Sequence, residues 1–371
     1  MYNFKEKNLS QDFCQLKIAE AQRLINLSVP FTVVGMPTAG ISFFLKFLAT
    51  RDFAKFIHID INELPSISKN ELLKLILKEL SGKTVVGDEP DLMEKIKIEL
   101  SKLVSKHDRV VLVFNRFDRL QSLFDQNFFA NLRTLWEVDK EKIVLVFTAN
   151  KPLTQIAPEA VSGGNLNLCG KVLYLTPHSG ADLIQLVKMN APNLLADQQR
   201  VRKALELGGG HYQLSLLLLK SDDLLKNPIA DPVIGFQLKE LTDFLNKKQQ
   251  NQLQQIILDK KLTAIDPFLV NVGFVKPNGS EVFSPLFKSY LLTHLDLKLP
   301  QKEQKLFKLL KSKNGKIVTK EEIFDQIWDQ DEEASDWALD SLIYRLRKNP
   351  VFTTQYLLES HKKQGYSLIK I

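Results

Sequence analysis

Residues 335–348 have the sequence SDWALDSLIYRLRK, and the C-terminal architecture can be inferred outward from this stretch. Four apolar residues recur at the spacing of one helix face: Leu339, Leu342, Ile343 and Leu346. That spacing predicts an amphipathic helix with Ser335 or Asp336 as its N-cap. The opposite face carries hydroxyl groups and cations: Ser341, Tyr344, Arg345 and Lys348, with Arg347 beside it.

Two more helices are predicted directly upstream. Pro300 suits the first turn of a helix whose leucines have helical spacing and which ends at Asn314-Gly315. Thr319 and Glu322 form a capping-box pattern that starts another helix. We expect this second helix to bury three side chains: Ile323, Ile327 and Trp328.

A β-hairpin is predicted downstream. Residues 352–358 are rich in strand-forming side chains, residues 359–365 are polar, and residues 366–369 form a second strand-like run. The tip of this hairpin would present Lys362 and Lys363.

These elements together resemble the OmpR/PhoB-type winged-helix DNA-binding domain. The resemblance rests on four ordered pieces: Leu299-x-x-x-Glu303-x-x-Leu306, Val318-Thr319-x-x-Glu322-Ile323-x-x-x-Ile327-Trp328, Ser335-Asp336-x-x-Leu339-Asp340-x-x-Ile343-x-Arg345-Leu346-Arg347-Lys348 and Gly365-Tyr366. It implies that the third helix is the recognition helix and that the hairpin is the wing. Two features depart from the family pattern. Trp337 stands where a polar or basic residue is usual, and only residues 291–299 are available for the small sheet that usually opens the domain.

The resemblance implies double-stranded DNA as a partner. Arginine donates in a planar fork to phosphate or guanine, and hydroxyl groups reach backbone or base edges. It also implies that residues 329–336 lie where family members contact RNA polymerase. A winged helix that contacts protein instead of DNA stays open as an alternative. The candidate DNA contacts are Ser341, Tyr344, Arg345, Arg347, Lys348, Lys362 and Lys363.

Length and composition predict a globular protein of several domains. The chain has 371 residues, 44% of them hydrophobic and 25% charged, and no apolar run reaches the roughly 18–20 residues of a membrane span. Its polar start, MYNFKEK, predicts no signal peptide. The two cysteines, Cys14 and Cys169, belong to no CxxC or Cys/His cluster spaced for zinc, so we expect a cytoplasmic protein without a metal site. The net charge of +7 permits a polyanionic partner without requiring one.

A second organisation occupies the N-terminal half. Residues 31–34, FTVV, predict a buried strand, and GMPTAGIS (35–42) follows before a helix rich in phenylalanine. Strand, glycine-bounded loop and helix form the setting of a phosphate-binding P-loop, G-x-x-x-x-G-K-[ST]. Gly35, Gly40 and Ser42 keep their places, but Ile41 replaces the lysine that would contact the β- and γ-phosphates.

A later buried strand ends without the expected acidic pair. Residues 109–118, RVVLVFNRFD, resemble a Walker B strand, yet Asn115-Arg116 stands where carboxylates would hold Mg²⁺ and orient water. Residues 142–150 and 171–175 resemble the next strands. LGGGHY (207–212) resembles the lid turn of STAND and archaeal-type AAA+ ATPases, with Tyr212 in place of the usual proline. The resemblance implies a P-loop fold. The missing lysine and carboxylates predict an inactive NTPase, to which no catalytic residue is assigned, and retained hydrolysis stays open as an alternative.

Nucleotide binding without hydrolysis stays open, because backbone N–H groups at residues 40–42 could still contact phosphate. ATP or ADP is therefore the only cofactor considered. The residues that would contact it are Gly35, Gly40, Ile41, Ser42, Asn115 and Asp118.

The fold class expected is α/β plus α+β, in four parts. They are a degenerate P-loop core (1–177), a helical lid (178–232), a winged helix packed on the core (233–297) and the OmpR/PhoB-type domain (298–371). The function expected is a DNA-binding transcription regulator with an inactive NTPase module that senses or scaffolds. A nucleotide-operated switch and an interaction scaffold stay open as alternatives, and so does self-association.

Overall fold

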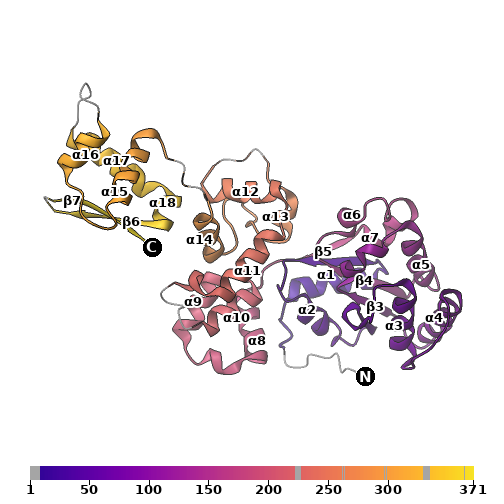
Figure 1. Ribbon diagram of the computed structural model, residues 1–371. Helices are drawn as coiled ribbons and strands as arrows, with labels where there is room; N and C mark the ends of the chain where they lie inside the picture. Colours follow the sequence, from indigo (N-terminus) through magenta and orange to yellow (C-terminus); the bar gives the residue numbers. More distant parts are fainter. Residues whose placement is uncertain are drawn as a thin grey trace. The chain divides into compact units, whose positions relative to one another are not determined.

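The computed structural model describes residues 9–221, 227–260, 262, 264–295, 297, 299–328, 335–362 and 364–371. The chain forms two compact units (Figure 1): residues 1–246 with 265–279, and residues 247–264 with 280–371. The expected fold class is confirmed, since the first unit is α/β and the second ends in helices and an antiparallel hairpin. The four-part division is finer than these two units. Its boundaries stay a prediction, including those of the winged helix at 233–297.

A parallel sheet forms the centre of the first unit, in the order β2-β3-β4-β1-β5. Three strands are buried along their whole length, as their continuous apolar sequences predict for strands covered on both faces. Strand β2 was not predicted, because it is an edge strand that is only partly buried and has polar ends. The five strands are β1 (Phe31–Gly35), β2 (Lys55–Asp60), β3 (Val110–Asn115), β4 (Ile143–Ala149) and β5 (Val172–Leu175).

Helices cover both faces of this sheet (Figure 1). Side chains of α1 and α2 share one hydrophobic cluster with strand residues such as Val33 and Val111, and side chains of α3, α4 and α5 share another with Leu112 and Leu145. The helices are α1 (Gln15–Asn26), α2 (Ile41–Leu48), α3 (Lys69–Ser81), α4 (Glu89–Val104), α5 (Gln126–Trp136), α6 (Leu153–Ile156) and α7 (Leu166–Cys169). Short 3₁₀ helices η1 (Ile61–Glu63), η2 (Phe117–Leu123) and η3 (Gly163–Asn165) follow β2, β3 and α6.

A run of helices follows β5, where the sequence predicts the lid. Leu183 of α8 and Leu216 of α10 join the cluster that covers one face of the sheet. The elements are α8 (Gly180–Asn190), η4 (Pro192–Leu195), α9 (Gln198–Gly208), α10 (Tyr212–Lys220), η5 (Pro228–Ala230), α11 (Pro232–Asp243) and α13 (Pro267–Asn271).

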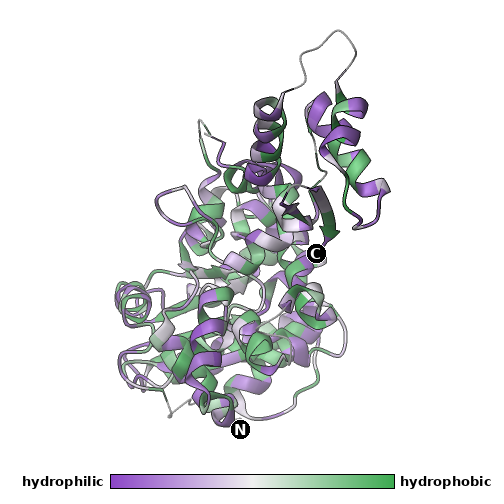
Figure 2. Ribbon diagram, turned by 90° about the vertical axis from the view of Figure 1, so that its left-hand side faces the viewer, coloured by the Kyte–Doolittle hydropathy of each residue, from purple (hydrophilic) through white to green (hydrophobic). Residues whose placement is uncertain are grey.

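The second unit contains the three helices predicted from residue 299 onward. Its described helices carry hydrophobic residues on one side and hydrophilic residues on the other (Figure 2). Its elements are α12 (Lys247–Ile257), α14 (Pro285–Thr293), α15 (Gln301–Ser312), α16 (Lys320–Ile327), α17 (Asp336–Lys348), α18 (Pro350–Gln355), β6 (Tyr356–His361) and β7 (Gly365–Lys370). The capping box of α16 and the burial of Ile323, Ile327 and Trp328 are confirmed. In the described part of the chain, none of the helices is both long and apolar enough to cross a bilayer.

One prediction about the hairpin was wrong. Residues 352–355 belong to helix α18, and the first strand begins only at Tyr356. The Asn349 side chain accepts hydrogen bonds from the N–H groups of Val351 and Phe352, and Pro350 stands at the first helical position. These start signals outweigh the strand propensity of the β-branched residues that follow.

An isolated antiparallel β-bridge between Val318 and Tyr366 connects the hairpin to the segment before α16. The N–H of Val318 donates to Tyr366 O at 2.8 Å, and the N–H of Tyr366 donates to Val318 O at 3.0 Å. Gly365 allows this approach because a Cβ atom there would lie 1.9 Å from Val318 O and its φ is +140°. The Gly365-Tyr366 pair quoted for the family resemblance is therefore a packing requirement.

An ion pair links α15 to α17 inside this domain. Arg345 Nε donates to Glu303 Oε1 at 2.5 Å, and the Glu303 side chain is only 6% exposed. A buried carboxylate needs such a partner because burial removes its hydration. Glu303 therefore depends on Arg345 for its charge balance.

We predict that Arg345→Ala lowers the free energy of unfolding of the second unit by roughly 1–3 kcal/mol, because it leaves a buried carboxylate unpaired. Adding Glu303→Gln to Arg345→Ala should restore part of the loss. Urea unfolding of the two variants and the wild type measures this. Equal stability of Arg345→Ala and the wild type would show that the pair has no structural weight.

Candidate functional site

The loop between β1 and α2 lines a cavity of about 340 Å³ at the carboxyl end of the sheet. Its other walls come from the ends of β3 and β4 and the first turn of α10. Gly35 lies just outside the lining, as the last residue of β1. Five of the six candidate nucleotide contacts line the cavity: Gly40, Ile41, Ser42, Asn115 and Asp118.

The loop keeps the backbone geometry of an anion site. Gly40 is the N-cap residue of α2 with φ 98°, a conformation that L side chains rarely adopt, and Ile41 and Ser42 form the first turn. The first N–H groups of a helix have no partner inside the helix and point out of its amino end. Ile41 instead packs against the hydrophobic cluster of the sheet, so no ammonium group supplements these N–H groups.

A closed polar network occupies the place of the acidic pair. Asn115 is 4% exposed, and its Oδ1 accepts a 3.1 Å hydrogen bond from Thr148 Oγ1. Thr148 Oγ1 in turn accepts from the Arg116 N–H at 2.7 Å. Arg116 Nη1 lies 2.7 and 2.8 Å from the two carboxylate oxygens of Asp60. An amide and a cation therefore stand where P-loop NTPases use carboxylates to hold Mg²⁺ and orient water.

The two nearby carboxyl groups have opposite pKa shifts. Burial opposes ionisation of Asp60, but the Asn62 N–H and the Arg116 guanidinium outweigh it, so the pKa of Asp60 is lowered. Burial raises the pKa of Asp118, although this carboxyl accepts a hydrogen bond from the Asn150 N–H. Asp60 is thus committed to an ion pair, and it was not among the predicted site residues because β2 was missed.

Two buried histidines contact carbonyl groups of the loop between β1 and α2. His211 Nδ1 accepts from the Leu214 N–H at 3.2 Å, so in the neutral ring Nε2 carries the proton and donates to Pro37 O at 2.8 Å. His178 Nε2 lies 2.8 Å from Ala39 O and must also donate, because a carbonyl can only accept. Burial lowers the pKa of both rings, that of His211 to about 4. The two rings meet at the loop only in the fold, since 33 positions separate them in the sequence.

The recognition-helix candidates divide into two groups. Ser341 Oγ bonds to Trp337 O within the helix, and Arg347 Nη2 donates to Leu358 O and to Ser360 Oγ of β6. Arg345 is paired with Glu303. These three have structural partners, which nothing in their spacing indicated.

The other candidates point away from the domain core. Tyr344 is 62% exposed, and Lys348 Nζ lies 5.6 Å from the centre of its ring. Lys362 is exposed at the turn between β6 and β7, whereas Lys363 lies outside the described residues. Trp337, singled out as a departure from the family, is 80% exposed seven residues before Tyr344 and so on the same helix face.

We predict that the first unit loses stability as the pH falls below about 6.5. Folded His211 has a pKa of about 4 against its usual 6.5, so between these values the unfolded chain binds more protons. The free energy of unfolding should then fall by up to about 1.4 kcal/mol per pH unit for this group. His211→Asn, which keeps a capping side chain, should reduce that slope in urea unfolding between pH 6.5 and 4.5. Substitution of the exposed His107 by Asn is the control, and an equal reduction there would contradict the assignment.

Residues 294–368 match the family described as "Transcriptional regulatory protein, C terminal". None of the curated proteins matches the chain.

Three solved structures are similar to most or all of the chain, at low identity. The ORC1 protein of Aeropyrum pernix, in complex with DNA, is 10% identical over 99% of this chain and 90% of its own, with a TM-score of 0.44. Cdc6p of Pyrobaculum aerophilum is 14% identical over 100% of this chain and 93% of its own, with a TM-score of 0.43. A Walker-type ATPase of Pyrococcus abyssi is 14% identical over 78% and 99%, with 0.47. Residues 294–368 carry an OmpR/PhoB-type winged-helix domain, in one chain with an α/β core built on a five-stranded parallel sheet.

Proposed function

We propose that this protein is a cytoplasmic, DNA-binding transcription regulator whose C-terminal domain recognises duplex DNA. The observation that supports it most is the outward face of α17 in a domain of the regulator family, where Tyr344 and Lys348 are exposed beside the hairpin. In this proposal α17 enters the major groove and the turn at Lys362 contacts the adjacent backbone or minor groove.

Two arginines position the surface as well as contact DNA. Glu303 engages Arg345 through Nε, and the arginine side chain remains 56% exposed, so its Nη groups can donate to phosphate. Arg347 links the carboxyl end of α17 to β6, which sets the distance between helix and wing. Because both residues support the domain, their loss would combine effects on folding and on binding. Lys348, Lys362 and Tyr344 are therefore better probes of DNA contact.

The exposed aromatic residues would supply base recognition. Trp337 and Tyr344 can make apolar contact with thymine methyl groups, and the Tyr hydroxyl can reach base or phosphate oxygens. The lysines would supply the salt-dependent part of the affinity by releasing counterions from phosphates. Contact with RNA polymerase near residues 329–336 belongs to the same proposal, although residues 329–334 lie outside the described residues.

The α/β core would act as a sensor or scaffold that does not hydrolyse nucleotide. The loop lacks its lysine, and the ends of β2 and β3 form the Asp60–Arg116–Asn115 network. Hydrolysis needs a metal-binding carboxylate and an oriented water. The carboxylate of Asp60 is engaged by Arg116, and an amide, Asn115, ends β3 where that carboxylate would stand. The alternative to this proposal is an interaction scaffold that does not recognise a specific DNA sequence.

We predict that Lys348→Ala and Lys362→Ala each weaken binding to duplexes selected from a random pool. Each should also reduce the slope of log affinity against log salt by about one, because each removes one phosphate contact. Tyr344→Ala should lower the preference for the selected sequence more than it changes that slope. Fluorescence anisotropy across a salt series measures all three, with melting temperature as a check on folding.

Lys308→Ala is the matched control for this experiment. It removes an exposed lysine from a different helix, α15, which contributes none of the candidate DNA contacts. An equal loss of affinity in Lys308→Ala, or a wild-type protein that enriches no sequence, would contradict specific recognition and favour the scaffold.

A nucleotide-operated switch is the second candidate, favoured by the cavity at the amino end of α2. We predict that ATP or ADP raises the melting temperature of the first unit without release of phosphate. Ile41→Lys should increase that shift because it restores a cation at the phosphates. Differential scanning calorimetry and a phosphate-release assay separate binding from turnover. Steady release by the wild type that a Gly40→Val variant abolishes would contradict the non-hydrolysing core.

A further inference from the structure

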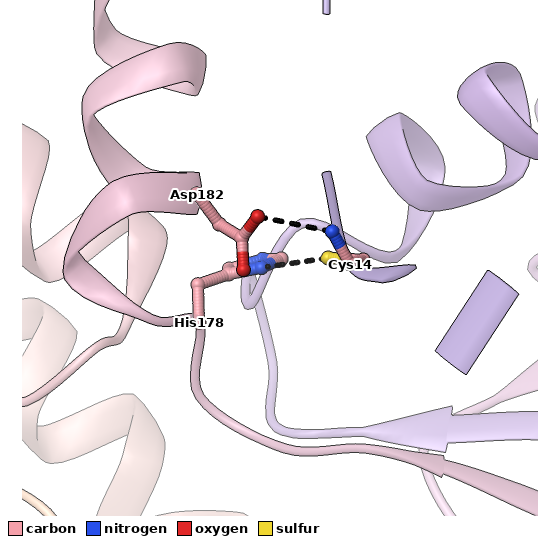
Figure 3. Close-up of side chains that lie close together, drawn as sticks. All are labelled: Cys14, His178 and Asp182. Atoms are coloured by element: carbon pink, nitrogen blue, oxygen red, sulfur yellow. Dashed lines mark hydrogen bonds between the residues drawn. The ribbon is translucent and has the colours of Figure 1, made fainter. Parts of the chain in front are cut away.

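Three side chains with metal-ligand atoms lie close together (Figure 3), and one of them contacts the loop between β1 and α2. They come from the turn before α1, the segment after β5 and the first turn of α8, and they are Cys14, His178 and Asp182. The Cys14 Sγ, one ring nitrogen of His178 and one carboxylate oxygen of Asp182 all lie within 4.8 Å of one another. Spacing along the sequence does not indicate this group, because 164 residues separate Cys14 from His178.

The surroundings fix the His178 ring in the form that can bind a metal. Its Nε2 donates to Ala39 O, so in the neutral ring Nδ1 has a free lone pair, and Nδ1 is the atom 3.3 Å from Cys14 Sγ. Metal-binding histidines usually donate their other ring N–H to a carbonyl or carboxylate, which sets the tautomer and the ring plane. His178 has this arrangement already, and its side chain is buried.

The other two groups are also directed at the same point. Asp182 Oδ1 accepts from the Cys14 N–H at 3.0 Å, and Oδ2 accepts from Ser179 Oγ at 2.7 Å. Each carboxylate oxygen has a second lone pair, so these bonds orient the group without exhausting it. Cys14 has φ 47°, a strained conformation for a side-chain-bearing residue, and its Sγ points toward His178 (Figure 3).

We propose that Cys14, His178 and Asp182 bind one divalent transition-metal ion of zinc type, with water as a fourth ligand. Sulfur, imidazole nitrogen and carboxylate oxygen form a ligand set that zinc accepts in tetrahedral sites. Ligands at zinc bond lengths and tetrahedral angles lie roughly 3.5 Å apart. The observed 3.3 Å between Sγ and Nδ1 is close to this separation.

Metal binding would exchange a proton for the ion. Burial, and then the charge of Asp182, raise the pKa of the Cys14 thiol to about 12, so without a cation the sulfur keeps its proton and donates to Nδ1. The ion would form bonds to Sγ, Nδ1 and Oδ, and the thiol proton would pass to solvent. The resulting thiolate and carboxylate charges would then be balanced by the ion.

The site would also act on the loop. His178 would connect the ion to the loop. Its Nδ1 would bind the ion, while its Nε2–H remains bonded to Ala39 O in the wall of the cavity. A cation on one ring nitrogen strengthens the N–H bond donated by the other. Metal occupancy would therefore stabilise the loop conformation through a single side chain.

The test is a Co²⁺ titration of the full-length protein after treatment with a chelator. We expect one Co²⁺ per chain, with a sulfur-to-cobalt charge-transfer band that Zn²⁺ displaces. Cys14→Ser should abolish the band and Asp182→Asn should weaken binding at least roughly tenfold. Cys169→Ser is the matched control, because Cys169 is the second cysteine of the chain and is buried in α7 away from this cluster. It should keep the band.

A second measurement covers the case in which Cys14→Ser does not fold. Alkylation of the wild-type protein, mapped by mass spectrometry, should show that Zn²⁺ slows modification of Cys14 and leaves Cys169 unaffected. The proposal is overturned by Co²⁺ spectra without the sulfur band, by a band that persists in folded Cys14→Ser, or by alkylation of Cys14 at an unchanged rate.

Discussion

Burial of one side of α17 is the constraint on which the functional account depends. Leu339, Leu342, Ile343 and Leu346 are all at most 3% exposed, and each contributes roughly 1.5–3 kcal/mol by leaving water. A helix whose apolar stripe is fixed in this way cannot rotate about its axis, so the exposed positions are determined too. The Glu303 pair and the Arg347 link to β6 then fix its carboxyl-terminal turn relative to α15 and the hairpin.

The α/β unit has the backbone of a phosphate-binding loop without the lysine and the acidic pair that usually accompany it. The P-loop geometry depends on Gly40, on the sheet and on the two histidines that bind Pro37 O and Ala39 O, and all of these are backbone or packing features. Hydrolysis in P-loop NTPases depends instead on single charged side chains. In this chain Ile41 stands at the position of the lysine and Asn115 at the position of a carboxylate. A sensor or scaffold requires only the first set, which agrees with the role proposed for this unit.

Local patterns in the sequence predicted most of the fold and part of the site. Helical periodicity located α15, α16 and α17, and the continuous apolar runs located β1, β3, β4 and β5, because these signals arise within one element. Residues 352–355 were misassigned since their β-branched side chains favour a strand, while the deciding signal, the Asn349 cap, precedes them. The partners of Arg345 and Arg347, and the meeting of Cys14 with His178, depend on contacts between distant segments that spacing cannot show.

The central claim is that the exposed side of α17 lies against DNA bases, and photo-crosslinking tests it most directly. A photoreactive phenylalanine derivative would replace Tyr344 in the full-length protein, and in a second preparation Lys308, each bound to a duplex enriched from a random pool. The account predicts a crosslink from position 344 to bases of the enriched sequence and none from position 308. Crosslinks from position 308 alone, or equal crosslinking to unselected duplex, would contradict it.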